Sequence, residues 1–226
     1  MRDVWLWWSS GKDSAWTLDV LRRSGEFRVT RLLTTVNRAF DRVAMHAVRG
    51  TLLQQQADAV GVSLERVDLP YPCSNAQYEA AVAPVLDAAV AAQIPCMAFG
   101  DLFLEDVRQY RIDLLDAYPI EPVFPIWGRD TARLAAEMVD GGLEAYVTCV
   151  DPRVLPRELA GRRFGSELLA ALPAGADPCG ENGEFHTFAV AGPMFARPVP
   201  VRVGEVVERD GFVFADLEPQ APAGMD

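Results

Sequence analysis

The chain has 226 residues, half of them hydrophobic, and a formal net charge of −11. This length and apolar content predict one sizeable domain with a real core, alone or with a smaller appendage. The acidic balance disfavours broad contact with nucleic acid, whose phosphates attract Lys and Arg. No apolar run approaches the roughly 20 residues that span a bilayer, and the start shows no signal-peptide pattern. We therefore expect a cytoplasmic protein with neither nucleic acid nor membrane as partner.

The first half of the chain alternates between strand and helix patterns. Apolar or β-branched runs predict strands at Val4–Trp8, Val29–Val36, Leu64–Leu69 and Cys96–Phe99. Apolar residues at helical spacing predict helices at Ser14–Arg23, His46–Val60, Tyr78–Ala89 and Asp106–Ala117, with a polar loop at Asn37–Met45. Within the third helix, Pro84 implies a kink or a later start.

This alternation predicts βαβ units and an α/β fold with a Rossmann-like parallel sheet. In such sheets, ligands bind outside the carboxyl ends of the strands. Polar segments follow three of the predicted strands, at Ser9–Ser14, Thr35–Asn37 and Gly100-Asp101. We expect these segments to converge on one crevice.

The second half has a different composition. Three prolines in Tyr118–Gly128 predict a connector, and the pattern beyond it is mixed α+β. We expect a helix at Asp130–Asp140, a strand at Leu143–Val150, a hairpin of Val199–Glu208 with Gly211–Leu217, and a disordered tail at Glu218–Asp226. The expected division is 1–125, 126–217 and 218–226.

The four cysteines are far apart and form no C-x-x-C pair, which argues against a zinc ribbon or a thioredoxin-type motif. They are Cys73, Cys96, Cys149 and Cys179. We expect reduced thiols with structural roles, and only Cys179 adjoins a motif that carries chemistry.

The first such motif is the loop Ser9-Ser10-Gly11-Lys12-Asp13-Ser14, between a strand and a helix. Backbone amides and the positive end of the helix dipole make this position suitable for an anion. Gly11 permits close approach, Lys12 supplies a charge suited to phosphate, and Asp13 suggests Mg²⁺. The glycine and lysine spacing is not that of a Walker A loop. The alternative is an ordinary turn with polar residues.

The second motif is Cys179-Gly180-Glu181-Asn182-Gly183-Glu184-Phe185-His186-Thr187. Its glycines permit tight turns, and its carboxylates could bind or deprotonate an amine. The alternative is a tight surface turn before a strand.

Together, the two motifs resemble a known family. The first resembles the S-G-G-K-D-S signature of the PP-loop ATP pyrophosphatases (adenine nucleotide alpha hydrolase-like), with Ser10 where the signature has Gly. Paired with C-G-E-x-G-E, it resembles the diphthine–ammonia ligase family. Three further segments agree in order: Phe99-Gly100-Asp101-Leu102 with Tyr110-Arg111, Pro125-Ile126-Trp127, and Glu137–Gly142.

The resemblance implies a PP-loop domain for residues 1–125 and a family-specific substrate part for 126–217. It also implies the reaction: ATP adenylates a carboxylate, ammonia displaces AMP, and pyrophosphate is the other product. The expected cofactors are ATP and Mg²⁺, and the expected partners are ammonia and an unidentified carboxylate acceptor, which need not be diphthine.

The resemblance also suggests roles for individual residues. The nucleotide would be held by Ser9, Ser10, Gly11, Lys12, Asp13, Ser14, Thr35, Asn37, His46 and Gly100, with Asp13 on the metal. Catalysis would fall to Lys12, Asp13, Asp101, Glu181 and Glu184. The acceptor or the amine would meet Arg108, Arg111, Asn182 and His186.

Five of these residues have structural alternatives. Asp101 could be the N-cap of the next helix, and His46 a solvated helix-start residue. Arg108 and Arg111 could lie on a solvated helix face, and His186 could be a structural strand residue.

Two other functions stay open: a PP-loop sulfurtransferase that thiolates tRNA, and a nucleotide-binding sensor without turnover. Scattered cysteines and acidic charge count against the first, and the S-x-G-K-D-S loop counts against the second. The apolar segment Val123–Trp127 could serve a homodimer interface.

Overall fold

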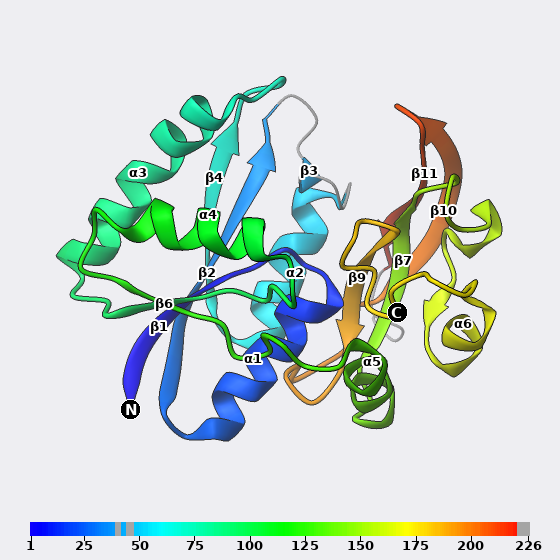
Figure 1. The fold of residues 1–226 in the computed structure, drawn as a ribbon, viewed down its shortest axis with the longest axis horizontal. Helices are drawn as coiled ribbons and strands as arrows, with labels where there is room; N and C mark the ends of the chain where they lie inside the picture. The colour runs from blue at the N-terminus through cyan, green and yellow to red at the C-terminus, as the bar shows by residue number, and fades with distance from the viewer. Residues whose placement is uncertain (39–41, 44–47, 221–226) are drawn as a thin grey trace, which may run out of the picture.

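The computed structural model of the chain describes residues 1–38, 42–43 and 48–220, and these residues form two sheets (Figure 1). The first sheet has parallel strands in the order β4-β2-β1-β5-β6, and short β3 pairs antiparallel with the end of β2. Its strands are β1 (Arg2–Trp7), β2 (Phe27–Asn37), β3 (Arg42–Val43), β4 (Ser63–Leu69), β5 (Cys96–Ala98) and β6 (Glu121–Val123). The α/β class expected from the sequence is confirmed.

Four helices accompany this sheet, and α1 and α2 lie between it and the second sheet (Figure 1). They are α1 (Lys12–Ser24), α2 (Gly50–Val60), α3 (Asn75–Ala91) and α4 (Glu105–Leu115). Helix α1 ends at Gly25, which has φ +68° and donates to the Arg22 carbonyl. Helix α3 begins with a capping box between Ser74 and Gln77.

The second sheet is antiparallel and centres on β7. Its strands are β7 (Glu144–Val150), β8 (Arg163–Phe164), β9 (Phe185–Ala191), β10 (Val201–Arg209) and β11 (Phe212–Pro219). Helices α5 (Thr131–Asp140) and α6 (Ser166–Ala171) and the short 3₁₀ helix η1 (Arg157–Leu159) surround it. The expected hairpin is β10–β11, and Asp130 caps α5 as expected by accepting from the Arg133 amide.

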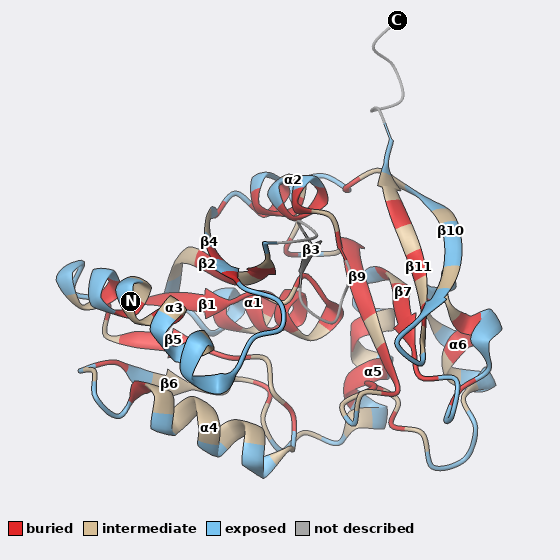
Figure 2. Cartoon of the chain, turned by 90° about the horizontal axis from the view of Figure 1, so that it is seen from above, coloured by how far each residue is buried: buried red, intermediate tan, exposed pale blue. Residues whose placement is uncertain are grey.

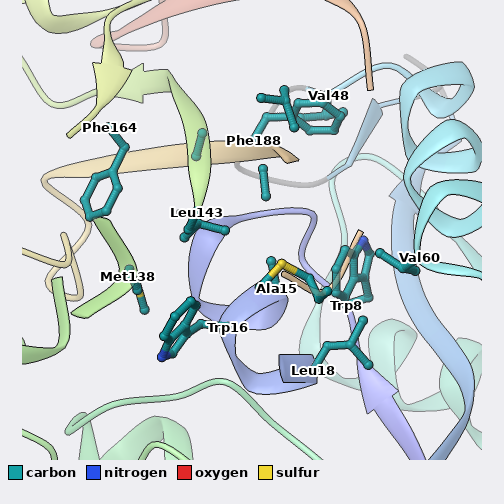
Figure 3. Packing of buried hydrophobic residues seen from close by; sticks show 14 of the residues in the cluster. Trp8, Ala15, Trp16, Leu18, Val48, Val60, Met138, Leu143, Phe164 and Phe188 are labelled. Atoms are coloured by element: carbon teal, nitrogen blue, oxygen red, sulfur yellow. The ribbon is translucent and has the colours of Figure 1, made fainter. Parts of the chain in front are cut away.

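Strand β1 shows how the sequence divides the core. Its alternate residues Val4 and Leu6, followed by Trp8, face a cluster that continues through α1 and α2 into the second sheet. Trp5 and Trp7 face the other cluster, under α3 and α4. Figure 2 shows buried positions in β1, β7 and β9, and Figure 3 shows Trp8, Trp16 and Met138 in the shared cluster. One apolar core therefore supports both sheets.

Some expected elements differ from the structure. The connector contains strand β6, whose Pro122 is tolerated because β6 is an edge strand that need not donate there. Helix α3 starts earlier than expected and continues through Pro84. Helix α2 begins at Gly50, and strand β2 runs on to Asn37.

The two ends of the expected tail have different outcomes. Glu218 and Pro219 belong to β11, where β-pairing to β10 holds them, so this part of the expected tail was wrong. Residues 221–226 lie outside the described residues. Among the residues that the structure describes, no helix has both the length and the apolar character needed to cross a membrane.

Candidate active site

Two adjoining cavities lie at the carboxyl ends of β1, β2 and β5. The wide cavity, of about 590 Å³, includes the ends of β2 and β4 and the starts of α3 and α4. The narrow cavity, of about 240 Å³, lies between the Ser9–Ser14 loop, the end of β5 and the Cys179–Thr187 motif. The residues common to both walls are Trp7, Ser9, Val107, Arg111 and His186. The shared wall makes them one two-chambered site, as expected for the ends of parallel strands.

The Ser9–Ser14 loop is held by its own hydroxyl groups. Ser9 Oγ accepts from the Gly11 amide at 3.3 Å and donates to Ser14 Oγ at 3.2 Å. Ser14 Oγ donates to the Gly11 carbonyl at 3.0 Å. Ser10 has φ +72°, a left-handed conformation that favours glycine. Serine therefore adopts here the backbone shape for which the signature has glycine.

Lys12 and Asp13 form a buried ion pair beside the narrow cavity. Lys12 Nζ donates to the two Asp13 carboxylate oxygens at 2.9 and 2.8 Å and also to the Cys179 carbonyl. Burial lowers the pKa of Lys12, but Asp13, Cys179 and Glu181 together outweigh it, so the pKa lies above its ordinary value. Burial raises the pKa of Asp13, and Lys12 opposes that rise. Lys12 is thus a cation already bonded within the protein.

Direct hydrogen bonds join the first motif to the second. The Lys12 amide donates to Thr187 Oγ1 at 3.0 Å, and the Ala189 amide donates to the Ser10 carbonyl at 3.0 Å. The Leu102 amide, just beyond β5, donates to Glu181 Oε1 at 2.7 Å. The two motifs therefore form opposite walls of one cavity.

Glu181 is the carboxylate of the second motif that lines the narrow cavity. Burial raises its pKa to about 7, the Leu102 hydrogen bond opposes the rise, and the charges of Asp13 and Asp101 add to it. A carboxylate that titrates near neutrality can accept a proton from a substrate at physiological pH.

Glu184 and Asn182 are not among the described residues that line either of these two cavities, and their expected roles at the substrate stay predictions. Glu184 Oε1 accepts from the Asp177 amide and from Asn182 Nδ2, both at 2.9 Å. Asp177 Oδ2 in turn accepts from the amides of Cys179 and Glu181 at 3.1 and 2.9 Å. Glu184 is buried because a loop this tight needs an internal acceptor, and it shapes the loop that carries Glu181.

Asp101 and Arg111 face each other in the narrow cavity, with Arg111 Nε 3.5 Å from Asp101 Oδ2. The Arg111 guanidinium lies over the rings of Trp7 and Phe99, 5.3 and 5.2 Å from their centroids. Burial raises the pKa of Asp101, and Arg111 opposes the rise. Helix α4 is capped at Leu104, so the N-cap alternative for Asp101 was wrong.

Arg108 is not among the described residues that line these two cavities, and its expected substrate contact stays a prediction. Its guanidinium packs over the rings of Phe124 and Trp127, 5.3 and 4.9 Å from their centroids. Arg108 lies one turn before Arg111 on α4, and the two guanidinium groups pack over different pairs of aromatic rings. A cation–π contact explains Arg108 without a ligand.

The remaining expected nucleotide contacts are divided. Thr35 lines the wide cavity, Asn37 is not among the described residues of either wall, and His46 lies outside the described residues. A Cβ on Gly100 would lie 3.1 Å from Thr17 Oγ1 and 3.2 Å from the Ser14 amide nitrogen. The absence of a side chain at Gly100 therefore lets the end of β5 pack closely against the first turn of α1.

Sequence reasoning missed residues that reach the site from outside the motifs. Tyr78 and Tyr110 line the wide cavity, and Tyr78 accepts a hydrogen bond from Arg111 at 3.4 Å. Gln56 is fully buried and bonds to the loop. A signal existed for Gln56, because it is a polar residue on the apolar face of a helix.

The donor set suits a magnesium ion carried by a nucleotide. Among the described residues, no group of three His, Cys, Asp or Glu side chains could hold a metal ion. Mg²⁺ commonly takes one or two carboxylates and completes its shell with phosphates and water. Asp13 and Asp101 both line the narrow cavity beside the helix N-terminus, where phosphate is favoured.

Comparison with known proteins agrees with this architecture. The family model for the diphthamide synthase C-terminal domain matches residues 130–215, which hold α5, most of the second sheet and the Cys179–Thr187 motif. Over 120 residues, the chain is 29% identical to the diphthine–ammonia ligase of Danio rerio. These matches support a relationship to the diphthine–ammonia ligase family.

Other diphthine–ammonia ligases match at similar levels. The diphthine–ammonia ligases of Rattus norvegicus and Bos taurus are 27% and 26% identical over 120 residues. These matches cover 50% of the chain and 45% of each relative, against 47% of the Danio rerio protein. The chain thus spans about half the length of the curated relatives it matches. A fold of the PP-loop superfamily is consistent with its parallel sheet.

Proposed function

We propose that the protein is an ATP-dependent amidoligase that converts a carboxylate and ammonia to an amide, with AMP and pyrophosphate as the other products. One observation carries the proposal: the two motifs line opposite walls of one narrow cavity. Glu181, whose pKa is about 7, lies there opposite the Ser9–Ser14 loop. Residues 1–125 would bind the nucleotide, and residues 126–217 would serve the nucleophile and acceptor.

In this proposal, the triphosphate lies on the first turn of α1 and the nucleoside extends toward Thr35 in the wide cavity. Asp13, aided by Asp101, would hold Mg²⁺, which would neutralise the charge that develops on pyrophosphate. Lys12 would move from Asp13 to a phosphate oxygen, because both groups lie at the cavity wall. Arg111, half-way between the chambers, would hold an anionic group of nucleotide or acceptor.

The chemistry needs two substitutions. An acceptor carboxylate oxygen attacks the α-phosphorus, forming the acyl adenylate as the bond to pyrophosphate breaks. Ammonium then gives one proton to Glu181, and ammonia attacks the acyl carbon while AMP leaves with the carboxyl oxygen. The Glu181 proton and the second proton lost from nitrogen pass to solvent or to the leaving group. His186 lines both chambers and would assist that transfer.

The cysteines supply an argument against the tRNA-thiolating alternative. A catalytic pair of cysteines needs accessible thiolates; Cys73 is exposed at the wide cavity, but Cys96, Cys149 and Cys179 are buried, and burial raises the pKa of Cys179 and that of Cys149 to about 12. Cys179 instead donates to the Thr131 carbonyl at 3.4 Å. Release of AMP with turnover would separate the ligase from a nucleotide-binding sensor.

The test follows the products. The protein is incubated with ATP, Mg²⁺, ammonium and a panel of carboxylic acids, and nucleotides are separated by chromatography. AMP and pyrophosphate in equal amounts are expected only when acceptor and ammonium are both present. ADP and inorganic phosphate as products would overturn the proposal. Asp13→Asn should abolish turnover, whereas Asp3→Asn, on the exposed pair with Arg28, should not.

A further inference from the structure

Gln56 of α2 is a buried amide whose hydrogen-bonding groups all contact the neighbourhood of the Ser9–Ser14 loop. Its Oε1 accepts from Trp8 Nε1 at 2.9 Å. Its Nε2 donates to the Ser10 carbonyl at 2.9 Å and to the Ala189 carbonyl at 2.6 Å. The side chain has no exposed surface. A primary amide is disfavoured in an apolar core unless its groups are bonded, so these three bonds explain its presence there.

These bonds fix the residues on both sides of Ser9. Trp8 lies between β1 and the Ser9–Ser14 loop, and its indole packs beside Val60 at the end of α2 (Figure 3). Ser10 is the left-handed residue of the loop, and its carbonyl accepts from two donors, Gln56 and the Ala189 amide. Gln56 therefore ties the loop to α2 and to β9 at the same point.

The orientation of the Ser10–Gly11 peptide follows from this tie. In a trans peptide, the carbonyl and the next N–H point in opposite directions. Because the Ser10 carbonyl points toward Gln56 and β9, the Gly11 N–H points the other way, to Ser9 Oγ on the shared wall of the two cavities. A rotated peptide would turn a carbonyl oxygen toward the site and repel phosphate.

We infer that Gln56 is a positioning residue for the nucleotide phosphates: its amide holds Ser10 in the left-handed conformation that turns the Gly11 N–H toward the site. The inference rests on the proposed function for its ligand. It adds a residue from α2, outside both motifs, and a reason why serine is tolerated at position 10 of this chain. The strain of a left-handed serine is offset by a dedicated side-chain donor.

The test uses a double-mutant cycle with a built-in rescue. Gln56→Met keeps the length of the side chain and removes its hydrogen bonds. Ser10→Gly removes the steric cost of the left-handed conformation, so the loop no longer needs Gln56 to adopt it. Gln54→Met is the matched control, because Gln54 lies on the exposed face of the same helix and its side-chain amide donates to Asp58 on that face.

Binding of Mg·ATP is measured by titration calorimetry, with folding checked by circular dichroism. Gln56→Met should raise the Kd at least tenfold in the wild-type background and less than threefold in the Ser10→Gly background. Gln54→Met should change it less than twofold. Equal losses of affinity from Gln56→Met in both backgrounds would mean that Gln56 only fills space, and would overturn the inference.

A second readout keeps the two proposals separable. If the wild-type protein does not bind Mg·ATP, the proposed function fails. Urea unfolding of the wild type, the two single variants Gln56→Met and Ser10→Gly, and the double variant then decides the role of Gln56. A smaller loss of stability from Gln56→Met in the Ser10→Gly background supports the inference, and additive losses overturn it. Where Gln56→Met does not fold, Gln56→Glu, which keeps the shape and removes the donor, replaces it in the same comparison.

Discussion

The backbone amide of Lys12 donates a hydrogen bond to the side-chain hydroxyl of Thr187, although 175 residues separate them. Lys12 begins α1, and Thr187 lies in β9 of the other sheet. A helix N-terminus leaves its first amides without partners inside the helix, and here a hydroxyl from a distant strand satisfies one of them. The contact makes the geometry of the phosphate loop depend on the position of the second sheet.

Thr187→Val tests this dependence. Valine has the shape of threonine, so the change removes the acceptor and leaves the buried Lys12 amide unsatisfied. We expect a loss of about 1–3 kcal/mol in the free energy of unfolding, measured in urea, and weaker binding of Mg·ATP. Thr187→Ser, which keeps the hydroxyl, should recover most of the affinity. If both variants bind ATP as the wild type does, this hydrogen bond does not support the loop.

Protonation of Glu181 should lower the rate of amide formation at acidic pH. Its pKa of about 7 predicts a rate that rises tenfold per pH unit below neutrality and levels above it, apart from the supply of free ammonia. Glu181→Gln keeps the acceptor for the Leu102 amide and removes the base, and should slow amide formation roughly 100-fold or more. Hydroxylamine is mostly unprotonated at neutral pH and should restore the variant. Equal losses with both nucleophiles would assign Glu181 to binding rather than to proton transfer.

The same carboxyl group should also affect stability. The folded chain holds its proton up to about pH 7, whereas the unfolded chain releases it near the ordinary value of 4.5. The folded state then binds more protons between these values, so the contribution of Glu181 to stability falls as pH rises through that interval. Glu181→Gln should flatten this part of the curve of unfolding free energy against pH. An unchanged curve would show that the group titrates normally.

Gly141 should be essential for packing α1 against α5. A Cβ there would overlap the ring of Trp16 and lie 2.9 Å from the Glu137 carbonyl oxygen. Gly141→Ala should lower the free energy of unfolding by about 3 kcal/mol, the upper range for overpacking. In a Trp16→Leu background the loss should become smaller, because the clash with the ring is gone and only the close approach to the Glu137 carbonyl remains.

Gly142 is the matched control for Gly141. It has φ +82° but open space around its Cβ position. Gly142→Ala should therefore lower stability by only about 1–2 kcal/mol, through backbone strain, and Trp16→Leu should not relieve it. A Gly141→Ala loss that also persists without Trp16 would place the constraint in the backbone.

Thiol labelling should separate one cysteine from the others. Cys73 is exposed at the wide cavity, whereas Cys96, Cys149 and Cys179 are buried. Iodoacetamide at pH 8 should label the native chain once, at Cys73, and four times after denaturation, as read by mass spectrometry. Rapid labelling of Cys179 in the native protein would reopen the sulfurtransferase interpretation.

Much of the first sheet could be predicted from local patterns. Apolar runs and helical spacing located β1, β2, β4 and β5 and their helices, because burial on one or both faces imposes those periods on the sequence. Strand β6 was missed because three prolines concealed it, and only its edge position makes Pro122 acceptable. The two motifs were readable because loops that bind anions need particular residues at fixed spacing.

The sequence by itself indicated the α/β class, a resemblance to the diphthine–ammonia ligase family and the two segments that meet at the site. Only the tertiary structure decided which carboxylate faces the cavity. Glu181 and Glu184 are three residues apart and chemically alike, yet one lines the narrow chamber and the other bonds within its own loop. The structure likewise paired Lys12 with Asp13 and brought Gln56 to Ser10. Such choices depend on desolvation and on contacts between distant segments, and neither is encoded in local spacing.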